Sequence, residues 1–167
     1  MLQDIWTTIT AEFSDLPDLA TITVITVRLV IAAVLGGILG YDRERKARSA
    51  GVRTHMLVAV GAALFVIGPA QAGMEIADMS RVIQGVVQGI GFLGAGAIIV
   101  RRSMHRVEGL TTAASIWATA GIGVIVGLGL EATAILSTII VLLILAVVPF
   151  VVPQGVAPDQ QADESKG

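Results

Sequence analysis

Five long apolar windows decide what this chain can fold into. A run of about 18 or more apolar residues can cross the hydrocarbon core of a bilayer as a helix. Only 14% of the 167 residues are charged, whereas a soluble domain carries about a quarter, and the charges are absent from long windows. The sequence therefore predicts an all-α, polytopic membrane protein with five transmembrane helices. The predicted spans are Leu19–Tyr41, Met56–Met74, Val82–Val100, Leu110–Leu128 and Ala132–Val152.

The last two windows are separated by a short glycine-containing segment. A single helix over 109–152 would be about 65 Å long, twice the thickness of a bilayer. Gly127, Gly129 and Glu131 therefore predict a tight hairpin. Outside the membrane domain of 19–152, residues 1–18 predict a periplasmic amphipathic segment, with a frayed tail as the alternative. Residues 153–167 predict a disordered cytoplasmic tail.

Lys and Arg residues gather in two connections between windows. Five lie between the first and second windows and three between the third and fourth, whereas the opposite side has only Arg81. Basic residues are enriched in cytoplasmic loops. We therefore predict that both basic loops and the C-terminus lie in the cytoplasm and the N-terminus in the periplasm.

Two parts of the chain match at an offset of 58 residues. Residues 24–54 and 82–112 share eight identities in 31 positions, including Gly36 with Gly94 and Gly51 with Gly109. This pattern favours two helical hairpins repeated in parallel plus a fifth helix, an arrangement known in transporters. The alternative is two hairpins of like topology that share loop chemistry without common descent.

Glycines crowd several of the predicted spans. We interpret them as faces on which helices approach closely, as in small-xxx-small pairs; the alternative is a helix broken near the cytoplasm, with unwound backbone lining a cavity. Gly91, Gly94 and Gly96 are predicted to form a flat face for a homodimer. The packing candidates are Gly36, Gly40, Gly89, Gly91, Gly94, Gly96, Gly123 and Gly127.

Arg28 is the one charged residue inside the first window. It lies about 20 Å from the cytoplasmic edge, where a guanidinium costs ~2.5–3.5 kcal/mol and usually marks function. Gln84 and Gln88 stand one turn apart, and the 58-residue offset places them at the depth of Arg28. The sequence predicts a buried Arg–Gln cluster, either functional or holding two spans together by hydrogen bonds.

The first basic loop contains two acids, Asp42 and Glu44. They could hold a hydrated divalent cation, but with five bases nearby we favour ion pairs. The predicted pairs are Glu44 with Arg48, and Asp42 with Arg43 or Arg45.

The two basic loops are predicted to meet on one surface. Their arginines would then need compensation by Asp42, Glu44 and Glu108 or by a bound anion. Thr54, Thr111 and Thr112 are predicted to cap the following helices, and His55 and His105 to be solvated on the rim. The arginines of this surface are Arg43, Arg48, Arg53, Arg101 and Arg106.

No pattern typical of catalysis is present in the sequence. The chain has no cysteine, which excludes disulfides and thiolate chemistry, and it shows no Ser/His/Asp constellation, Walker motif or zinc motif. The glycines of 89–94 match a dinucleotide fingerprint but lie in an apolar window without a βαβ unit. We predict a protein that is not an enzyme and has no cofactor and no nucleic-acid partner.

Two blocks of sequence resemble the signatures of the MgtC/SapB family of bacterial inner-membrane proteins. The first is GGILGYDRER at 36–45, continuing with AGVRTH at 50–55, and the second is GIGFLGAG at 89–96, continuing with VEGLTTAASIW at 107–117. The resemblance covers 24–150. It departs at Asp42, commonly Glu in the family, and after the last span, where some members carry a soluble domain.

The resemblance implies a bacterial inner-membrane protein of a virulence-associated family, linked to magnesium limitation, acid stress and ion homeostasis. An Mg²⁺ pathway would require an acidic residue within the spans, and none lies there. We therefore favour action through a membrane partner. The alternatives are an ion transporter or channel with a pathway near Arg28, Gln84 and Gln88, or anionic lipid or phosphate binding by the basic loops.

Overall fold

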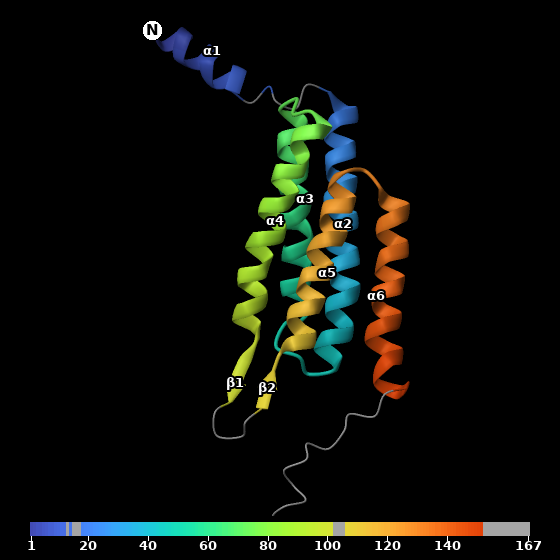
Figure 1. Ribbon diagram of the computed structural model, residues 1–167. Helices are drawn as coiled ribbons and strands as arrows, with labels where there is room; N and C mark the ends of the chain where they lie inside the picture. The colour runs from blue at the N-terminus through green and yellow to red at the C-terminus, as the bar shows by residue number, and fades with distance from the viewer. Residues whose placement is uncertain (13, 15–17, 102–105, 152–167) are drawn as a thin grey trace, which may run out of the picture.

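The computed structural model describes residues 1–12, 14, 18–101 and 106–151. Its long helices run side by side as a bundle, and two short strands connect two of them at one end (Figure 1). The elements are α1 (Leu2–Glu12), α2 (Leu19–Arg45), α3 (Val52–Gln71), α4 (Ile76–Ala97), β1 (Ile99–Arg101), β2 (Arg106–Glu108), α5 (Leu110–Gly127) and α6 (Glu131–Val151).

Four helices are long and apolar enough to cross a membrane: α2, α3, α5 and α6. They correspond to four of the five predicted windows, so the structure confirms a helical membrane protein. The fifth predicted span is not among them. Helix α4 has 22 residues, about 33 Å of helix, but Arg81, Gln84, Gln88 and its glycines lower its mean hydropathy.

The ends of α2 are set by local chemistry. Asp18 is the N-cap and accepts a hydrogen bond of 2.7 Å from the Thr21 N–H, which lowers the pKa of this carboxylate. The helix continues past the predicted end at Tyr41 to Arg45, because no helix breaker follows. It stops where Ala47 adopts a positive φ of 50°.

The turn between α5 and α6 confirms the predicted hairpin. Helix α5 ends at Gly127 and α6 begins at Glu131. Gly129 has a φ of 79°, a conformation typical of the residue that terminates a helix. The Leu130 N–H closes the turn on the Ile125 carbonyl at 3.1 Å.

The connection between α4 and α5 is a short antiparallel ladder. Ile99 pairs with Glu108 and Arg101 with Arg106. Helix α4 therefore ends at Ala97, three residues before the predicted boundary. Gly109 follows the ladder with a φ of 91°, and a Cβ there would lie 2.0 Å from the Ala97 carbonyl oxygen, so the close approach requires glycine.

Helix α3 packs between α2 and α5, and glycines set both contacts. A Cβ at Gly36 of α2 would lie 2.5 Å from the His55 carbonyl oxygen, and one at Gly123 of α5 would lie 2.3 Å from the Ala59 carbonyl oxygen. A Cβ at Gly40 would lie 2.6 Å from the Val52 Cα, and one at Gly127 would lie 2.8 Å from the Val66 Cβ. Close backbone approach at these positions brings the polar residues at one end of the bundle together.

The glycines of α4 behave differently from one another. A Cβ at Gly94 would contact the Ala113 Cβ at 3.6 Å, so Gly94 faces α5. For Gly89, Gly91 and Gly96, no heavy atom of the described chain lies within 4 Å of such a Cβ. The three glycines therefore do not form the single flat face that was predicted. At about 100° per residue Gly96 points about 140° away from Gly91, and Gly94 is packed against α5.

The two hairpins share packing positions at the offset of 58 residues. Gly36 packs on His55 and Gly94 on Ala113, and Ala113 follows His55 in the sequence by the same offset. Gly51 and Gly109 are the N-caps of α3 and α5. These contacts support the repeat, which remains a prediction.

Candidate functional site at the basic end of the bundle

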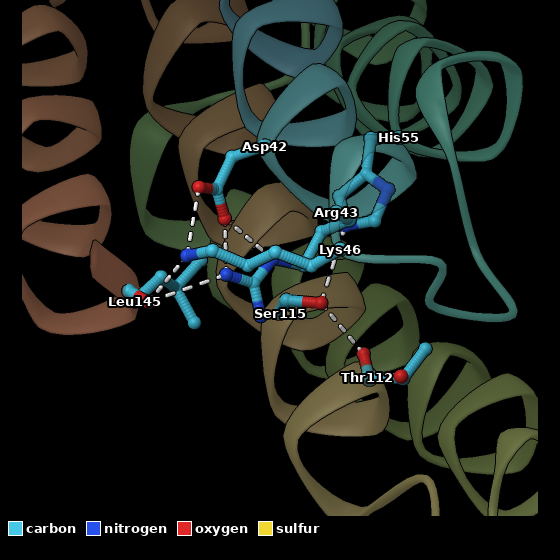
Figure 2. A network of polar contacts seen from close by, with 7 residues as sticks. All are labelled: Asp42, Arg43, Lys46, His55, Thr112, Ser115 and Leu145. Atoms are coloured by element: carbon cyan, nitrogen blue, oxygen red, sulfur yellow. Dashed lines mark hydrogen bonds and ion pairs between the residues drawn. The ribbon is translucent and has the colours of Figure 1, made fainter. Parts of the chain in front are cut away.

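The end of α2 carries a charged cluster formed by Asp42, Arg43 and Lys46, of which only Arg43 is buried (Figure 2). The side chain of Arg43 is only 2% exposed. Asp42 Oδ2 accepts from Arg43 Nε at 2.8 Å and also from Nη2, and its Oδ1 pairs with Lys46 Nζ at 2.9 Å. The predicted pair of Asp42 with Arg43 is present, and Lys46 is a partner that the sequence analysis did not name.

Both cations of the cluster also reach α6. The Leu145 carbonyl oxygen accepts from Lys46 Nζ at 2.9 Å and from Arg43 Nη2 at 3.4 Å. In a helix this carbonyl would accept the N–H of the residue four positions later, which is Pro149 and has none. The proline leaves a carbonyl without its helical partner, and the cations of α2 bind it.

His55 lies inside the bundle beside this cluster, and its exposed fraction is 0%. Its Nδ1 lies 3.0 Å from the Gly51 carbonyl oxygen and its Nε2 lies 3.2 Å from Ser115 Oγ. The prediction of a solvated rim histidine is therefore wrong for His55. The close packing of α3 against the glycines of α2 places this side chain in the interior. His105 lies outside the described residues.

Ser115 links His55 to α5. Its Oγ donates to the Thr112 carbonyl oxygen at 2.8 Å, yet it also lies within reach of His55 Nε2. A hydroxyl has one proton to donate. With neutral His55 donating from Nδ1 to Gly51, that proton must be shared between two acceptors. Protonated His55 would instead donate from both nitrogens. The direction of the hydrogen bond between His55 Nε2 and Ser115 Oγ therefore depends on whether His55 is protonated.

Glu44 holds the start of α3. Its Oε2 accepts the Val52 N–H at 2.9 Å, one of the N–H groups that a helix start leaves unpaired. The predicted pair with Arg48 is not formed among the described residues. Thr54 and Thr112 do not cap their helices either, because the N-caps are Gly51 and Gly109 and neither has a side-chain capping bond. Thr111 is exposed, and Thr112 is 3% exposed.

Arg28 belongs to the opposite end of the bundle. Its Nη1 donates to the Gly127 carbonyl oxygen at 3.1 Å, and its Nε lies 3.7 Å from Glu131 Oε1. Gln84 and Gln88 are exposed on α4, which packs mainly on α5 and α3. The predicted buried Arg–Gln cluster is therefore wrong: the turn after α5 provides Arg28 with a carbonyl and a carboxylate instead.

Of the other predicted arginines, the two whose side chains the structure describes do not join the cluster at the end of α2. Arg48 and Arg53 are exposed, unlike Arg43. Arg101 and Arg106 are opposed in the β1–β2 ladder, and their side chains lie outside what the structure describes. Asp42 pairs with Arg43 and Lys46 of its own helix, and Glu44 binds the start of α3. The predicted interleaving of these acids with Glu108 and the arginines of the second loop stays a prediction. Across the described residues, no three His, Asp or Glu side chains gather as metal ligands.

Comparison with known proteins identifies the group to which this arrangement belongs. The MgtC family model matches residues 29–153, which run from within α2 through α6. The chain belongs to the MgtC family. This MgtC-family chain is 45% identical over 130 residues to Protein SrpB of Synechococcus elongatus, with 71% of each chain covered.

Two further MgtC relatives are longer than the matched region. Identity is 40% over 128 residues with the Putative magnesium transporter YhiD of Escherichia coli K12, covering 72% of this chain and 59% of YhiD. It is 45% over 114 residues with Protein MgtC of Salmonella typhimurium LT2, covering 68% of this chain and 48% of that protein. No solved structure matches the chain. Family and apolar helices together identify a bacterial membrane protein.

Proposed function

We propose that this protein is a non-enzymatic inner-membrane protein that acts in magnesium homeostasis and pairs with a second membrane-embedded chain through the exposed face of α4. The magnesium connection comes from the name of one relative, the Putative magnesium transporter YhiD. The mode of action rests on one observation: Gln84 and Gln88 are exposed on a helix that packs beside candidate spans.

The position of α4 supports five crossings. It packs on α5 and α3, which are both candidate spans, and its 22 residues match the hydrocarbon thickness of about 30 Å. Neighbouring helices lower the requirement for an apolar surface. We therefore propose that α4 is embedded in the membrane as the fifth span.

An embedded α4 leaves two amides in hydrocarbon. Within the described chain, neither Gln84 nor Gln88 has a side-chain hydrogen-bond partner. An unpaired amide in an apolar medium is costly, and glutamines bond across helix interfaces in membranes. Gly91 and Ala95 continue the same face at helical spacing and permit close approach. The face therefore fits another transmembrane helix.

A second copy of the chain is the partner that we propose. Identical glutamines facing each other across a two-fold axis satisfy each other's donors and acceptors. The chain has no cysteine, so a Gly91→Cys variant carries a unique thiol. Oxidation of membranes should give a disulfide-linked dimer with Gly91→Cys, and no dimer with the control Leu136→Cys on the exposed side of α6.

The link to function is tested by growth under magnesium limitation. A deletion strain carrying the Gln84→Leu/Gln88→Leu double variant should grow as poorly as one without the gene, while the exposed control Gln71→Leu on α3 should restore growth. A link from Gly91→Cys to a different protein would replace the second copy with that partner. Normal growth of the double variant would contradict the proposal.

The structure does not favour the transport alternative in the form predicted. A single pathway past Arg28, Gln84 and Gln88 requires the three side chains to share one passage. Arg28 contacts the turn between α5 and α6, whereas the two glutamines lie on the exposed surface of α4.

A further inference from the structure

A groove of about 670 Å³ runs between α3 and α4. Its walls are almost wholly apolar, and glycines make it deep. Gly61 of α3 and Gly85 and Gly89 of α4 line it, and a Cβ at any of the three would meet no described heavy atom within 4 Å. The groove therefore exists because three side chains are missing from facing helices.

The length of the groove matches one leaflet of a bilayer. Along α3 it extends from Arg53 to Phe65, which is about 18 Å at the rise of an α-helix. Half of the hydrocarbon core measures about 15 Å. An acyl chain that enters the groove at the Arg53 end would reach the region of Phe65 near the middle of the bilayer.

Among the described residues that line the groove, polar side chains lie only at one end. Arg53 and Thr54 line the mouth, and both are exposed at the start of α3. In the part of the chain that the structure describes, the Arg53 guanidinium has no hydrogen bond or ion pair. A guanidinium is well suited to bind phosphate oxygens in bidentate fashion, and the threonine hydroxyl offers a second donor.

We propose that the groove binds one anionic phospholipid of the adjacent leaflet, with an acyl chain between α3 and α4 and the phosphate on Arg53 and Thr54. The apolar walls select a lipid over free phosphate, and the cation at the mouth selects an anionic headgroup. The site is distinct from the partner face, because Gly91 follows Gly89 by two residues and points about 200° away around the helix.

The test uses the full chain purified in a neutral detergent. Melting temperature is titrated with phosphatidylglycerol and with phosphatidylcholine of identical acyl chains. A lipid that binds only the folded state raises the melting temperature. Phosphatidylglycerol should bind the wild type about fivefold more tightly, as expected for one arginine near an anionic lipid.

Two variants separate the two halves of the site. Gly89→Leu fills the groove and should abolish the shift from both lipids. Arg53→Gln should leave binding of phosphatidylcholine unchanged and remove the preference for phosphatidylglycerol. Matched controls are Gly68→Leu, an exposed glycine of α3 outside the groove, and Arg48→Gln, an exposed arginine outside the groove. Both controls should keep the wild-type lipid preference.

Three results would overturn the proposal. Equal stabilisation of the wild type by the two lipids would remove the headgroup preference. Inorganic phosphate acting as well as phosphatidylglycerol would show that no acyl chain is needed. A dimer that dissociates in Gly89→Leu while the lipid response is unchanged would assign the groove to a second copy. Unchanged helicity by circular dichroism verifies that Gly89→Leu is folded.

Discussion

At Asp42 a single carboxylate holds two cations that both reach one carbonyl of a distant helix. Breaking a buried pair costs more than forming it contributes, because the remaining charge is left without compensation. Arg43, at 2% exposure, is the charge that would be left. The carboxylate is therefore the residue on which the cluster depends most.

We predict that Asp42→Asn lowers the free energy of unfolding by about 1–3 kcal/mol, less than for a fully buried ion pair, because the Asp42 side chain is 21% exposed. The melting temperature in detergent measures this, with the exposed Asp78→Asn as a control that should be neutral. An unchanged melting temperature would show that Arg43 does not need the charge. Stabilisation of the wild type but not of Asp42→Asn by Mg²⁺ would instead reveal a cation site here.

Contacts between residues that are close in sequence were the part of this site that could be predicted. The Asp42–Arg43 pair could be anticipated because the two are adjacent on a helix. The Glu44 contact with the Val52 N–H could not, because it depends on how the chain reverses after Ala47. His55 was misread because a histidine at the start of a helix is buried or exposed according to the neighbouring helix.

At the scale of helices, packing of α3 is governed by backbone contact rather than by side-chain interlocking. Where a glycine faces a carbonyl, even one added carbon must displace a helix. The sequence indicated which glycines come in pairs but not which of them face inward. Which glycine faces inward depends on how the helix is rotated about its axis. On α4, Gly94 packs against α5, whereas no described heavy atom lies within 4 Å of a Cβ at Gly91.

A pair of glycines on α5 tests this directly. Gly123→Ala places a Cβ 2.3 Å from the Ala59 carbonyl oxygen, whereas Gly121→Ala adds one in open space. We predict that Gly123→Ala destabilises the protein by about 1–3 kcal/mol or prevents folding, and that Gly121→Ala is neutral. Expression level and melting temperature compare the two. Equal behaviour would mean that α3 and α5 are further apart than described.

The attachment of α6 depends on a proline. If Pro149 frees the Leu145 carbonyl for Lys46, a restored N–H should compete for that oxygen. We predict that Lys46→Met destabilises the wild type more than it destabilises Pro149→Ala. The double-mutant cycle should show a coupling of about 0.5–3 kcal/mol, measured by melting temperature. Additive effects would indicate that the lysine and the proline act independently.

At the scale of the whole molecule, the ends of the bundle differ in charge. The end at which α2 connects to α3 and α4 connects to α5 carries most of the Lys and Arg residues, and Figure 1 shows these connections together at one end. The windows of Leu19–Tyr41 and its three equivalents could be recognised because length and apolarity suffice. The window Val82–Val100 predicted the helix that is α4, but composition does not identify α4 as a span, because Arg81, Gln84 and Gln88 lower its mean hydropathy.

Sidedness is the prediction that belongs to this scale. A cysteine at Ser49, in the first basic connection, should react with an impermeant thiol reagent only after the cells are permeabilised. A cysteine at Met74, in the turn between α3 and α4, should react from the periplasm, because positive residues are retained in the cytoplasm. Labelling of Ser49→Cys in intact cells would show that the orientation is the reverse of the predicted one. Labelling of the cysteines at Ser49 and at Met74 from the same side would argue against α3 as a span.

The polar contacts of α6 also bear on the order in which the chain is assembled. Its polar ties lead back to α2: Glu131 to Arg28, and the Leu145 carbonyl to Arg43 and Lys46, 102 and 99 residues away. A ribosome adding about 5–20 residues per second needs roughly 5–20 s to cover that distance. During that interval α2 has been synthesised but its Arg43 and Lys46 side chains lack the Leu145 carbonyl as a hydrogen-bond acceptor. The contacts between α2 and α6 therefore form last during synthesis. A chain that stops before Leu145 lacks the carbonyl that Arg43 and Lys46 bind.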